Sequence, residues 1–271
     1  MALYIIGTPI GNLGDMPPRA VEVLSSCDFA AAEDTRVTQK LLTRFGINVR
    51  LLSYHEHNRS RSGAGILERL ENGETGALVS DAGMPVISDP GQELVSECHT
   101  RSIPVLLVPG PSALTCALAL SGLPSGRFCF EGFLSVSRKN RYEHLDELKS
   151  ERRTMVFYEA PHKLMNTLRD MLEFWGDRRA SVSREMTKLH EETLTGTLSS
   201  LAEHFSKIKP KGEIVLIVEG AGKPQPLSLE ATVELALSHQ ELPPSQAARL
   251  VAKSSGRSRR EIYEKTFLKK S

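Results

Sequence analysis

The sequence predicts an α/β protein built from two α/β domains and a small C-terminal helical module. Short apolar runs alternate with helix-like stretches through residues 1–122, which is typical of a parallel sheet with helical crossovers. After residue 123 the runs return at closer spacing, too close for helical crossovers throughout, and this indicates a mixed sheet over residues 123–222. A length of 271 residues agrees with about two domains.

Five strands are expected in the first domain, and each ends in a polar or Gly/Pro-rich turn. The strands are residues 3–6, 29–32, 49–53, 77–79 and 105–108. Helices should follow the turns, and we expect Thr35 to cap the one that ends near residue 45. Because the carboxyl ends of parallel strands meet at one edge, the turns should form one rim, made of Thr8-Pro9, Glu33-Asp34, His55, Ser80-Asp81 and Gly110.

The stretch from Ser80 to Gly91 is the strongest candidate for a ligand loop. It follows a buried apolar run, a helix should begin near Gln92, and Gly83 allows close approach of backbone to a ligand. The loop has two carboxylates, no Lys or Arg, and no phosphate-binding glycine pattern. A neutral or cationic small molecule is therefore favoured over a nucleotide triphosphate, with an ordinary strand–helix turn as the alternative.

Several other kinds of site are disfavoured. Glycines at positions 7, 11 and 14 lack the dinucleotide spacing, so a nicotinamide-binding domain is not expected. His55 and His57 invite a metal interpretation, but no third ligand is near, and we expect no metal. The four cysteines are scattered and no apolar run is long enough to span a membrane, so we predict a cytoplasmic protein with no membrane partner. Residues 1–10 resemble a first core strand more than a signal peptide.

The second domain should contain strands at residues 128–133, 154–158, 180–183, 191–196 and 213–218. Helices are expected at residues 138–149, up to residue 174, and at 198–208. A Pro- and Gly-containing linker at residues 221–227 then leads to the tail.

The tail is basic and helical. Residues 241–271 carry a net charge of +5, and the rest of the chain −4. Helices at 228–239, 246–255 and 259–268, with Gly256 in the last turn, give a helix-turn-helix-like pattern. We interpret residues 226–271 as a nucleic-acid docking module; a structural cap, a solvated terminus and a DNA regulator are alternatives. The candidate nucleic-acid-binding residues, which the resemblance described next assigns to RNA, are Arg249, Lys253, Arg257, Arg259, Arg260 and Lys265.

Seven motifs in fixed order carry a family resemblance. They are residues 7–13, 32–36, 80–85, 108–113, 158–162, 184–188 and 212–214. With these motifs the chain resembles, over about residues 3–268, the tetrapyrrole-methylase superfamily of S-adenosylmethionine-dependent methyltransferases. Within the superfamily it is most similar to the bacterial enzymes that methylate 16S ribosomal RNA. Met84 stands where the tetrapyrrole enzymes carry Asp, which favours an RNA substrate over a corrin.

The resemblance implies a cofactor, a reaction and partners. S-adenosylmethionine would lie in a cleft between the two domains, and its methyl group would go to the ribose 2′-hydroxyl of a cytidine in the 16S rRNA decoding region. The small ribosomal subunit would be the partner, and the enzyme a homodimer. The implied cofactor-binding residues are Thr8, Pro9, Ser80, Asp81, Ala82, Gly83, Met84, Ile87, Gly110, Ser112, Ala113, Tyr158, Glu159, Gly212, Glu213 and Ile214.

A ribose hydroxyl is a poor nucleophile, so its proton should be removed by a base or its charge stabilised by a cation. The candidate bases are Glu33, Asp34, Asp81 and Glu185, and the candidate charge stabilisers or phosphate clamps are Arg36, Arg184 and Lys188. Residues 33–36 could instead form a helix cap with a local ion pair, and Arg184-Glu185 an inter-domain salt bridge.

Two other functions compete with RNA methylation. A methyltransferase for a small tetrapyrrole or corrin precursor would have no use for the basic tail. A non-catalytic RNA-binding assembly factor would have no use for intact cofactor motifs.

Overall fold

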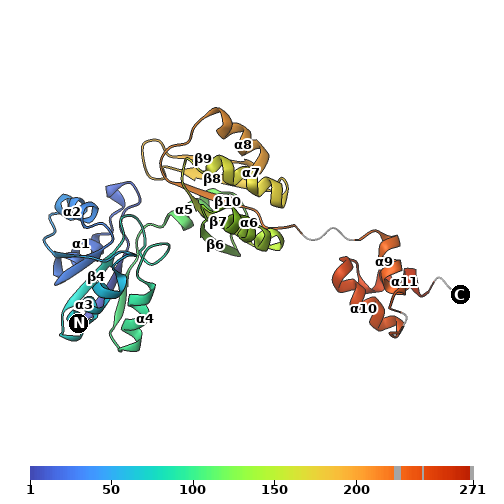
Figure 1. Cartoon of the computed structure of the whole chain (residues 1–271), viewed down its shortest axis with the longest axis horizontal. Coiled ribbons are helices and arrows are strands. Elements are labelled where there is room, and N and C mark those ends of the chain that lie inside the picture. The colour runs from blue at the N-terminus through green and yellow to red at the C-terminus, as the bar shows by residue number, and fades with distance from the viewer. Residues whose placement is uncertain (223–226, 240, 269–271) are drawn as a thin grey trace. The chain divides into compact units, whose positions relative to one another are not determined.

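The computed structural model describes residues 1–222, 227–239 and 241–268, which form two compact units. The larger, the α/β unit, comprises residues 1–149 and 153–219 and contains two five-stranded sheets. The smaller, with residues 150–152 and the described residues from 220 onward, contains the helical module of α9 (Leu229–Leu237), α10 (Pro244–Ser255) and α11 (Arg259–Thr266) (Figure 1). The predicted fold class is confirmed, while the domain boundaries at residues 122 and 222 stay predictions.

The first sheet is parallel, with strand order β3-β2-β4-β1-β5. Its strands are β1 (Ala2–Ile6), β2 (Phe29–Ala32), β3 (Arg50–Ser53), β4 (Thr75–Val79) and β5 (Val105–Val108). One face is covered by α1 (Pro18–Ser26) and α2 (Thr35–Arg44), and the other by α3 (Arg59–Glu71) and α4 (Gln92–Thr100). Strand order reverses between β1 and β4, and in such sheets ligands bind at the carboxyl ends of the strands that flank the reversal.

The start of α2 corrects one prediction. Thr35 does not cap this helix; it is the first helical residue, and Asp34 is the cap. The extended backbone of Asp34 places its carboxylate over the free end of the helix, where Oδ1 accepts a hydrogen bond from the Arg36 N–H at 2.8 Å. The same carboxylate pairs with the Arg36 guanidinium at 2.6 Å.

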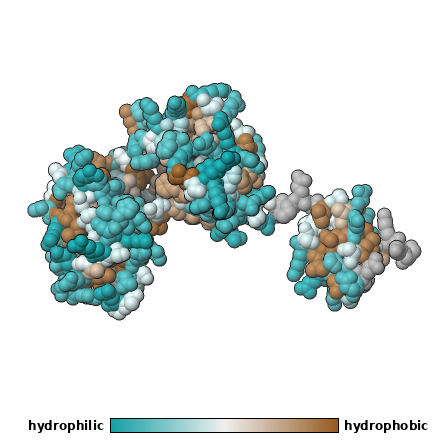
Figure 2. All heavy atoms as spheres, viewed as in Figure 1, coloured by the Kyte–Doolittle hydropathy of each residue, from teal (hydrophilic) through white to brown (hydrophobic). Residues whose placement is uncertain are grey.

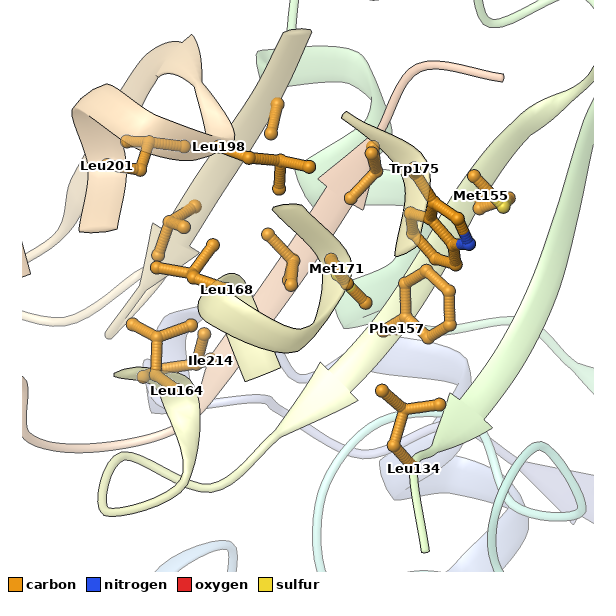
Figure 3. Close-up of a cluster of buried hydrophobic side chains, with 14 of the residues drawn as sticks. Leu134, Met155, Phe157, Leu164, Leu168, Met171, Trp175, Leu198, Leu201 and Ile214 are labelled. Atoms are coloured by element: carbon orange, nitrogen blue, oxygen red, sulfur yellow. The ribbon is translucent and has the colours of Figure 1, made fainter. Parts of the chain in front are cut away.

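The second sheet is mixed, with strand order β6-β7-β10-β8-β9, and only β6 and β7 run parallel. Its strands are β6 (Phe128–Phe133), β7 (Thr154–Glu159), β8 (Arg179–Arg184), β9 (Glu192–Thr197) and β10 (Ile214–Val218). The helices α6 (Arg138–Glu147), α7 (Leu164–Trp175) and α8 (Leu198–Lys207) cover one face and enclose a core around Phe157, Met171 and Trp175 (Figure 3). The mixed sheet that the close strand spacing predicts is confirmed.

Helix α5 (Ala113–Leu120) joins the two halves of the α/β unit. It directly follows β5 of the first sheet, but Leu114, Ala117 and Leu118 pack against β7 and β10 of the second. Ile10, from the loop after β1, belongs to the same apolar cluster. The central strands β7 and β10 are therefore buried on both faces, and α5 makes an apolar contact between the two halves.

The helical module has its own small core, formed by Ala236, Ala248, Val251 and Ile262. Gly256 adopts the left-handed conformation (φ 70°) that ends α10, and Ser258 caps α11. The predicted helix–turn–helix pattern is present, and the predicted linker lies partly outside the described residues. Hydrophilic residues cover most of the α/β unit on the face seen in Figure 2, and no helix in the described ranges is long and apolar enough to cross a membrane.

Candidate active site

The loops after β1 and β4 are bound to each other at the point where strand order reverses. Thr8 and Gly83 exchange two backbone hydrogen bonds of 2.9 and 3.1 Å, and the Thr8 hydroxyl donates to the Ser80 carbonyl at 3.2 Å. Thr8 is buried, so its role is to hold the central loop rather than to contact a ligand.

Gly7 and Gly110 are in backbone-to-backbone contact beside this pair of loops. A Cβ atom on Gly7 would lie 2.6 Å from the Gly110 Cα, and one on Gly110 would lie 2.7 Å from the Gly7 carbonyl carbon. No side chain fits at either position, so the ends of β1 and β5 can approach this closely only because both residues are glycine. Gly110 therefore shapes the rim without lining the cavity described next.

The central loop holds two non-glycine residues in the left-handed region, Val86 (φ 78°) and Ser88 (φ 74°). A β-branched residue such as Val86 is strained there, by about 1–3 kcal/mol. The surrounding packing must hold this conformation, and it turns Ile87 and Ser88 toward a cavity.

That cavity, of about 420 Å³, lies between the two halves of the α/β unit and is called the inner cavity below. Of the predicted cofactor residues, it brings together Asp81, Ala82, Gly83, Met84, Ile87, Ser112, Ala113, Tyr158, Glu159, Gly212, Glu213 and Ile214. None of the described residues that line it is basic, whereas four are carboxylates. Its size suits a small organic molecule, and its charge suits a cation.

Seven further lining residues lie outside the predicted cofactor set; they are Ile10, Ser88, Asp89, Phe133, Ala160, Pro161 and Val215. Asp89 was visible as a carboxylate of the central loop, and burial, with Glu33 and Asp81 nearby, raises its pKa to about 6. Phe133 gives no signal in the sequence. It reaches the cavity because the register of β6 on β7 places it opposite Tyr158, whose ring centroid lies 5.6 Å from its own.

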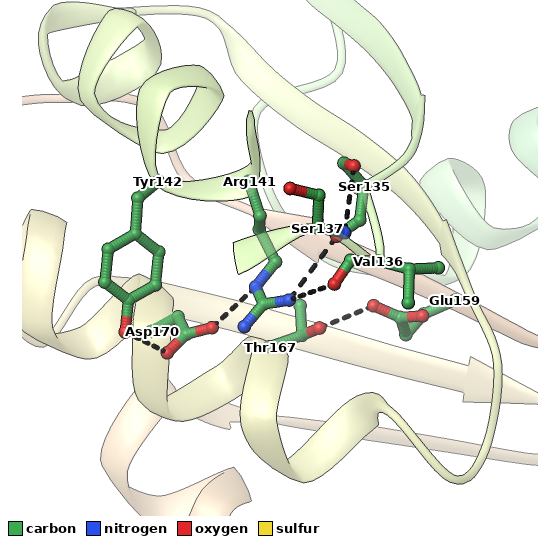
Figure 4. A network of polar contacts seen from close by, with 8 residues as sticks. All are labelled: Ser135, Val136, Ser137, Arg141, Tyr142, Glu159, Thr167 and Asp170. Carbon is green, nitrogen blue, oxygen red and sulfur yellow. Dashed lines mark hydrogen bonds and ion pairs between the residues drawn. The ribbon is translucent and has the colours of Figure 1, made fainter. Parts of the chain in front are cut away.

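Glu159 fixes the segment that carries Tyr158. Its buried carboxylate accepts a hydrogen bond from the Thr167 hydroxyl at 2.5 Å (Figure 4). It accepts a second from the Ala160 N–H at 2.8 Å. In the same view, Asp170 of α7 accepts from Arg141 at 2.7 Å and from Tyr142 at 3.1 Å, which ties α6 to α7. These hydrogen bonds hold the end of β7 against α7, and α7 against α6.

A second cavity of about 320 Å³, the outer cavity, adjoins the first. The two share four lining residues, which are Ile10, Asp81, Ala82 and Glu213. Pro9 and Ser80, two of the predicted cofactor residues, line the outer cavity and not the inner one. Asp81 and Ala82 therefore stand where two bound molecules would meet.

Among the candidate bases, Asp81 alone lines both cavities. Partial burial and the nearby Asp34 charge raise its pKa, while the Asp34 N–H, which donates to its Oδ1 at 3.1 Å, lowers it. Burial and the Asp81 charge also raise the pKa of Glu33, which lines neither cavity. Hydrogen bonds from Arg36 hold the pKa of Asp34 far below its usual value. Asp34 and Arg36 therefore form the helix cap with a local ion pair that was the alternative to a catalytic role.

The motif that contains Arg184 does not form the inter-domain salt bridge considered as an alternative. Arg184 pairs with Glu192 of the neighbouring strand at 2.6 Å. Glu185 accepts from Lys188 at 2.9 Å, and that hydrogen bond lowers its pKa. Lys188 also pairs with Glu213 at 3.2 Å and lies over Gly11 of the first half, where it lines the outer cavity.

The basic residues of the helical module fall into two groups. Arg257 pairs with Glu261 and Arg260 with Glu264 at 2.8 Å, so part of their charge is neutralised within the module. The remaining candidates are exposed and make no ion pair with any described residue; they are Arg249, Lys253, Arg259 and Lys265.

Comparisons with known proteins first identify the class of protein. The family model of the tetrapyrrole (corrin/porphyrin) methylases matches residues 2–202. A cobalt precorrin-4 methyltransferase superposes with a TM-score of 0.59 at 16% identity, over 80% of this chain and 94% of that one. A uroporphyrin-III C-methyltransferase from Thermus thermophilus, complexed with S-adenosylhomocysteine, gives 0.55 at 18% identity, over 81% and 97%. The chain therefore belongs to the tetrapyrrole-methylase family of methyltransferases.

Closer relatives define the branch. The model of the RsmI C-terminal HTH domain matches residues 225–265. The ribosomal RNA small subunit methyltransferase I of Synechocystis is 47% identical over 97% of this chain and 96% of its own, and that of Thermotoga maritima is 51% identical over 80% and 98%. The enzyme of the same name from Escherichia coli O157:H7 is 44% identical over 97% and 93%. The chain belongs to the ribosomal RNA small subunit methyltransferase I family, which confirms the predicted resemblance.

Proposed function

We propose that the protein transfers a methyl group from S-adenosylmethionine to the ribose 2′-hydroxyl of a cytidine in the decoding region of 16S rRNA. Membership of the family makes the chain an S-adenosylmethionine-dependent rRNA methyltransferase. The position and the ribose oxygen are the proposed part. The observation that carries it is the meeting of two cavities at Asp81 and Ala82, one acidic and one with basic residues in its wall.

The residues of the inner cavity fit the cofactor. S-adenosylmethionine carries a sulfonium and an ammonium group. The described lining of the cavity has four carboxylates and no basic residue, so it favours both positive charges. We assign Asp89 and Asp81 to this electrostatic role, and Met84, Ile87, Ala113 and Tyr158 to packing against the adenosine. The buried Glu159 acts indirectly, by holding Tyr158 in place.

The bound cofactor supplies an electrophilic methyl group, and the protein supplies position and a proton acceptor. In the proposed reaction Asp81 accepts the proton of the ribose hydroxyl at the junction of the cavities. Lys188, held by Glu185 and Glu213, places an ammonium hydrogen-bond donor in the outer cavity, where it can bind the developing alkoxide or a neighbouring phosphate. Arg36 and Arg184, paired with Asp34 and Glu192, orient their own loops.

One assay tests the proposal against its competitors. The protein is incubated with methyl-labelled S-adenosylmethionine and small subunits from a strain that lacks the gene, and the labelled nucleotide is mapped. We expect label on the ribose of one decoding-region cytidine. Label on a base or on another nucleotide would contradict the proposed position. Label on a tetrapyrrole but not on RNA would favour the small-molecule alternative, and no cofactor binding would favour the assembly factor.

Cofactor binding should depend on pH through Asp89. Its pKa of about 6 is raised above the ordinary carboxyl value of 3.8, so it takes up a proton as the pH falls through 6. Only the ionised form attracts a cation, so S-adenosylmethionine affinity should be constant above pH 7 and fall about tenfold per pH unit well below 6. Calorimetric titration from pH 5 to 8 measures this. Asp89→Asn should bind weakly and lose the part of the pH dependence centred near pH 6, leaving only that of Asp81; a wild-type-like profile in this variant would assign the titration elsewhere.

The helical module should contribute salt-dependent RNA affinity. The association constant K for RNA falls with salt concentration, so log K plotted against log salt has a negative slope. Replacing Arg249 and Lys253 by alanine in the full chain is expected to reduce the magnitude of that slope by about 1.5 and to leave cofactor affinity unchanged. Arg260→Ala is the matched control, because its guanidinium is already paired with Glu264. Filter binding to 16S rRNA at several salt concentrations gives the slopes. Equal slopes for both variants would mean that the module is structural.

A homodimer and a cytoplasmic location complete the proposal. Leu106 and Leu107 of the edge strand β5 and Leu120 at the end of α5 are exposed, and they offer an apolar surface to a second copy. Light scattering tests the dimer, and a monomeric mass at micromolar concentration would exclude it. The location follows from the proposed substrate, the small ribosomal subunit.

A further inference from the structure

One part of the wall of the outer cavity contains none of the predicted cofactor residues and has no role in the reaction as proposed so far. It is formed by α2 and by the short 3-10 helix η1 (Leu13–Asp15). From α2 the lining residues are Val37, Thr38, Lys40, Leu41 and Arg44. Val37, Lys40 and Arg44 are spaced by three and four residues, so they lie on one face of the helix.

The apolar part of this wall is open to solvent. Val37 is 40% exposed and Leu13 is 45% exposed, and both line the cavity. Exposed apolar side chains in a concave wall provide a packing surface for a flat or apolar group, such as a nucleoside. They come from two different elements, so the surface is created by the fold and not by one helix alone.

The charged part of the wall is unneutralised. Lys40 and Arg44 are exposed and make no ion pair with any residue in the described part of the chain. Arg36, on the same helix, is by contrast paired with Asp34 at 2.6 Å. Two cations four residues apart on a helix repel each other, and an anion bound between them would relieve that repulsion.

Thr38 adds a polar group to the same wall. Its side chain is 3% exposed, and its hydroxyl oxygen has no hydrogen-bond partner within the described residues. A buried hydroxyl without a partner is costly in the free protein, and rotation about its Cα–Cβ bond is enough to offer it to a bound molecule.

We propose that this face of α2, with Leu13, is the subsite that positions the acceptor nucleotide: Lys40 and Arg44 bind a backbone phosphate, and Val37 and Leu13 pack against the nucleoside. The proposal rests on the proposed function, because it requires an RNA acceptor. It makes Lys40 and Arg44 positioning residues, which act on substrate binding and not on the methyl group. Asp81, which lines the same cavity and accepts a hydrogen bond from the N-cap residue of α2, then faces the ribose.

Charge reversal tests the subsite. The double variant Lys40→Glu/Arg44→Glu is compared with Arg61→Glu, an exposed residue of α3 on the other face of the first sheet that lines neither cavity. We expect the double variant to raise the KM for small subunits about tenfold or more, with the cofactor dissociation constant and the melting temperature unchanged. The milder Lys40→Ala/Arg44→Ala should reduce, by about 1.5, the magnitude of the slope of log K for RNA binding against log salt concentration. Arg61→Glu should leave all four quantities unchanged.

The outcomes separate this subsite from the function on which it rests. Wild-type methylation of rRNA with equal KM values for the double variant and Arg61→Glu would overturn the subsite alone. A wild type that binds cofactor but labels no rRNA would overturn the proposed function and the subsite with it. A decrease in kcat at saturating RNA, with KM unchanged, would also contradict the positioning role. If the double variant also lowers cofactor affinity, the test rests on Lys40→Ala/Arg44→Ala. An unchanged dependence of RNA affinity on salt in that alanine variant would overturn the subsite.

Discussion

Gly7→Ala is expected to lower methyl transfer by on the order of 100-fold and to destabilise the fold by about 2–3 kcal/mol. The new Cβ would lie 2.6 Å from the Gly110 Cα and equally close to the Met84 sulfur, and a backbone atom cannot move away as a flexible side chain can. The ends of β1 and β5 must separate, and a shift of about 1 Å in the loops that position a cofactor has this scale of effect on rate. Calorimetric cofactor binding, thermal unfolding and the labelling assay measure the three consequences.

Gly65→Ala is the matched control for that variant. Gly65 lies inside α3 and a Cβ there would meet no heavy atom within 4 Å. Alanine should therefore stabilise the helix by about 0.5–1 kcal/mol and leave activity unchanged. If Gly7→Ala behaves like Gly65→Ala, the contact between the two loop ends is not needed for the site.

Asp81→Asn is expected to lower kcat by on the order of 10²- to 10⁴-fold, the usual contribution of a general base. The amide oxygen can still accept the Asp34 N–H, so the loop should keep its conformation, and cofactor affinity should fall far less than kcat. The wild-type rate should rise with pH through the raised pKa of Asp81. In the variant this acidic limb should disappear.

Glu33→Gln controls for the charge of the rim. Glu33 stands beside Asp81 with a raised pKa but lines neither cavity. A loss of kcat in Asp81→Asn but not in Glu33→Gln supports the proton-acceptor role of Asp81. An Asp81→Asn enzyme that keeps more than about one tenth of the wild-type rate would contradict it, because a missing base costs at least about 100-fold.

Most of the fold could be predicted because it follows local rules. Strands such as residues 29–32 and 105–108 are apolar runs closed by turn residues, and the structure has them with the predicted bounds. The parallel first sheet, the mixed second sheet and the helical module follow from the spacing of such runs. Helix α5 was harder: its sequence is apolar along its length and does not reveal which sheet it covers, and it covers the second.

Within the candidate site, the sequence determined which loops come together, and the tertiary structure decided what each side chain does there. The parallel strands of the first sheet bring their ends to one edge, which predicted the rim, and the family resemblance of the seven motifs implied cofactor residues such as Gly83 and Ser112. Asp34, Arg184 and Asp81 look alike in the sequence as charged residues at strand ends. The local pairing of Asp34 with Arg36 was one of the alternatives that the sequence offered. Only the fold pairs Arg184 with Glu192, leaves Asp81 between two cavities, and turns Lys40 and Arg44 toward the outer one. The physical reason is that the partner and solvation of a charge depend on neighbours distant in sequence, which no local pattern records.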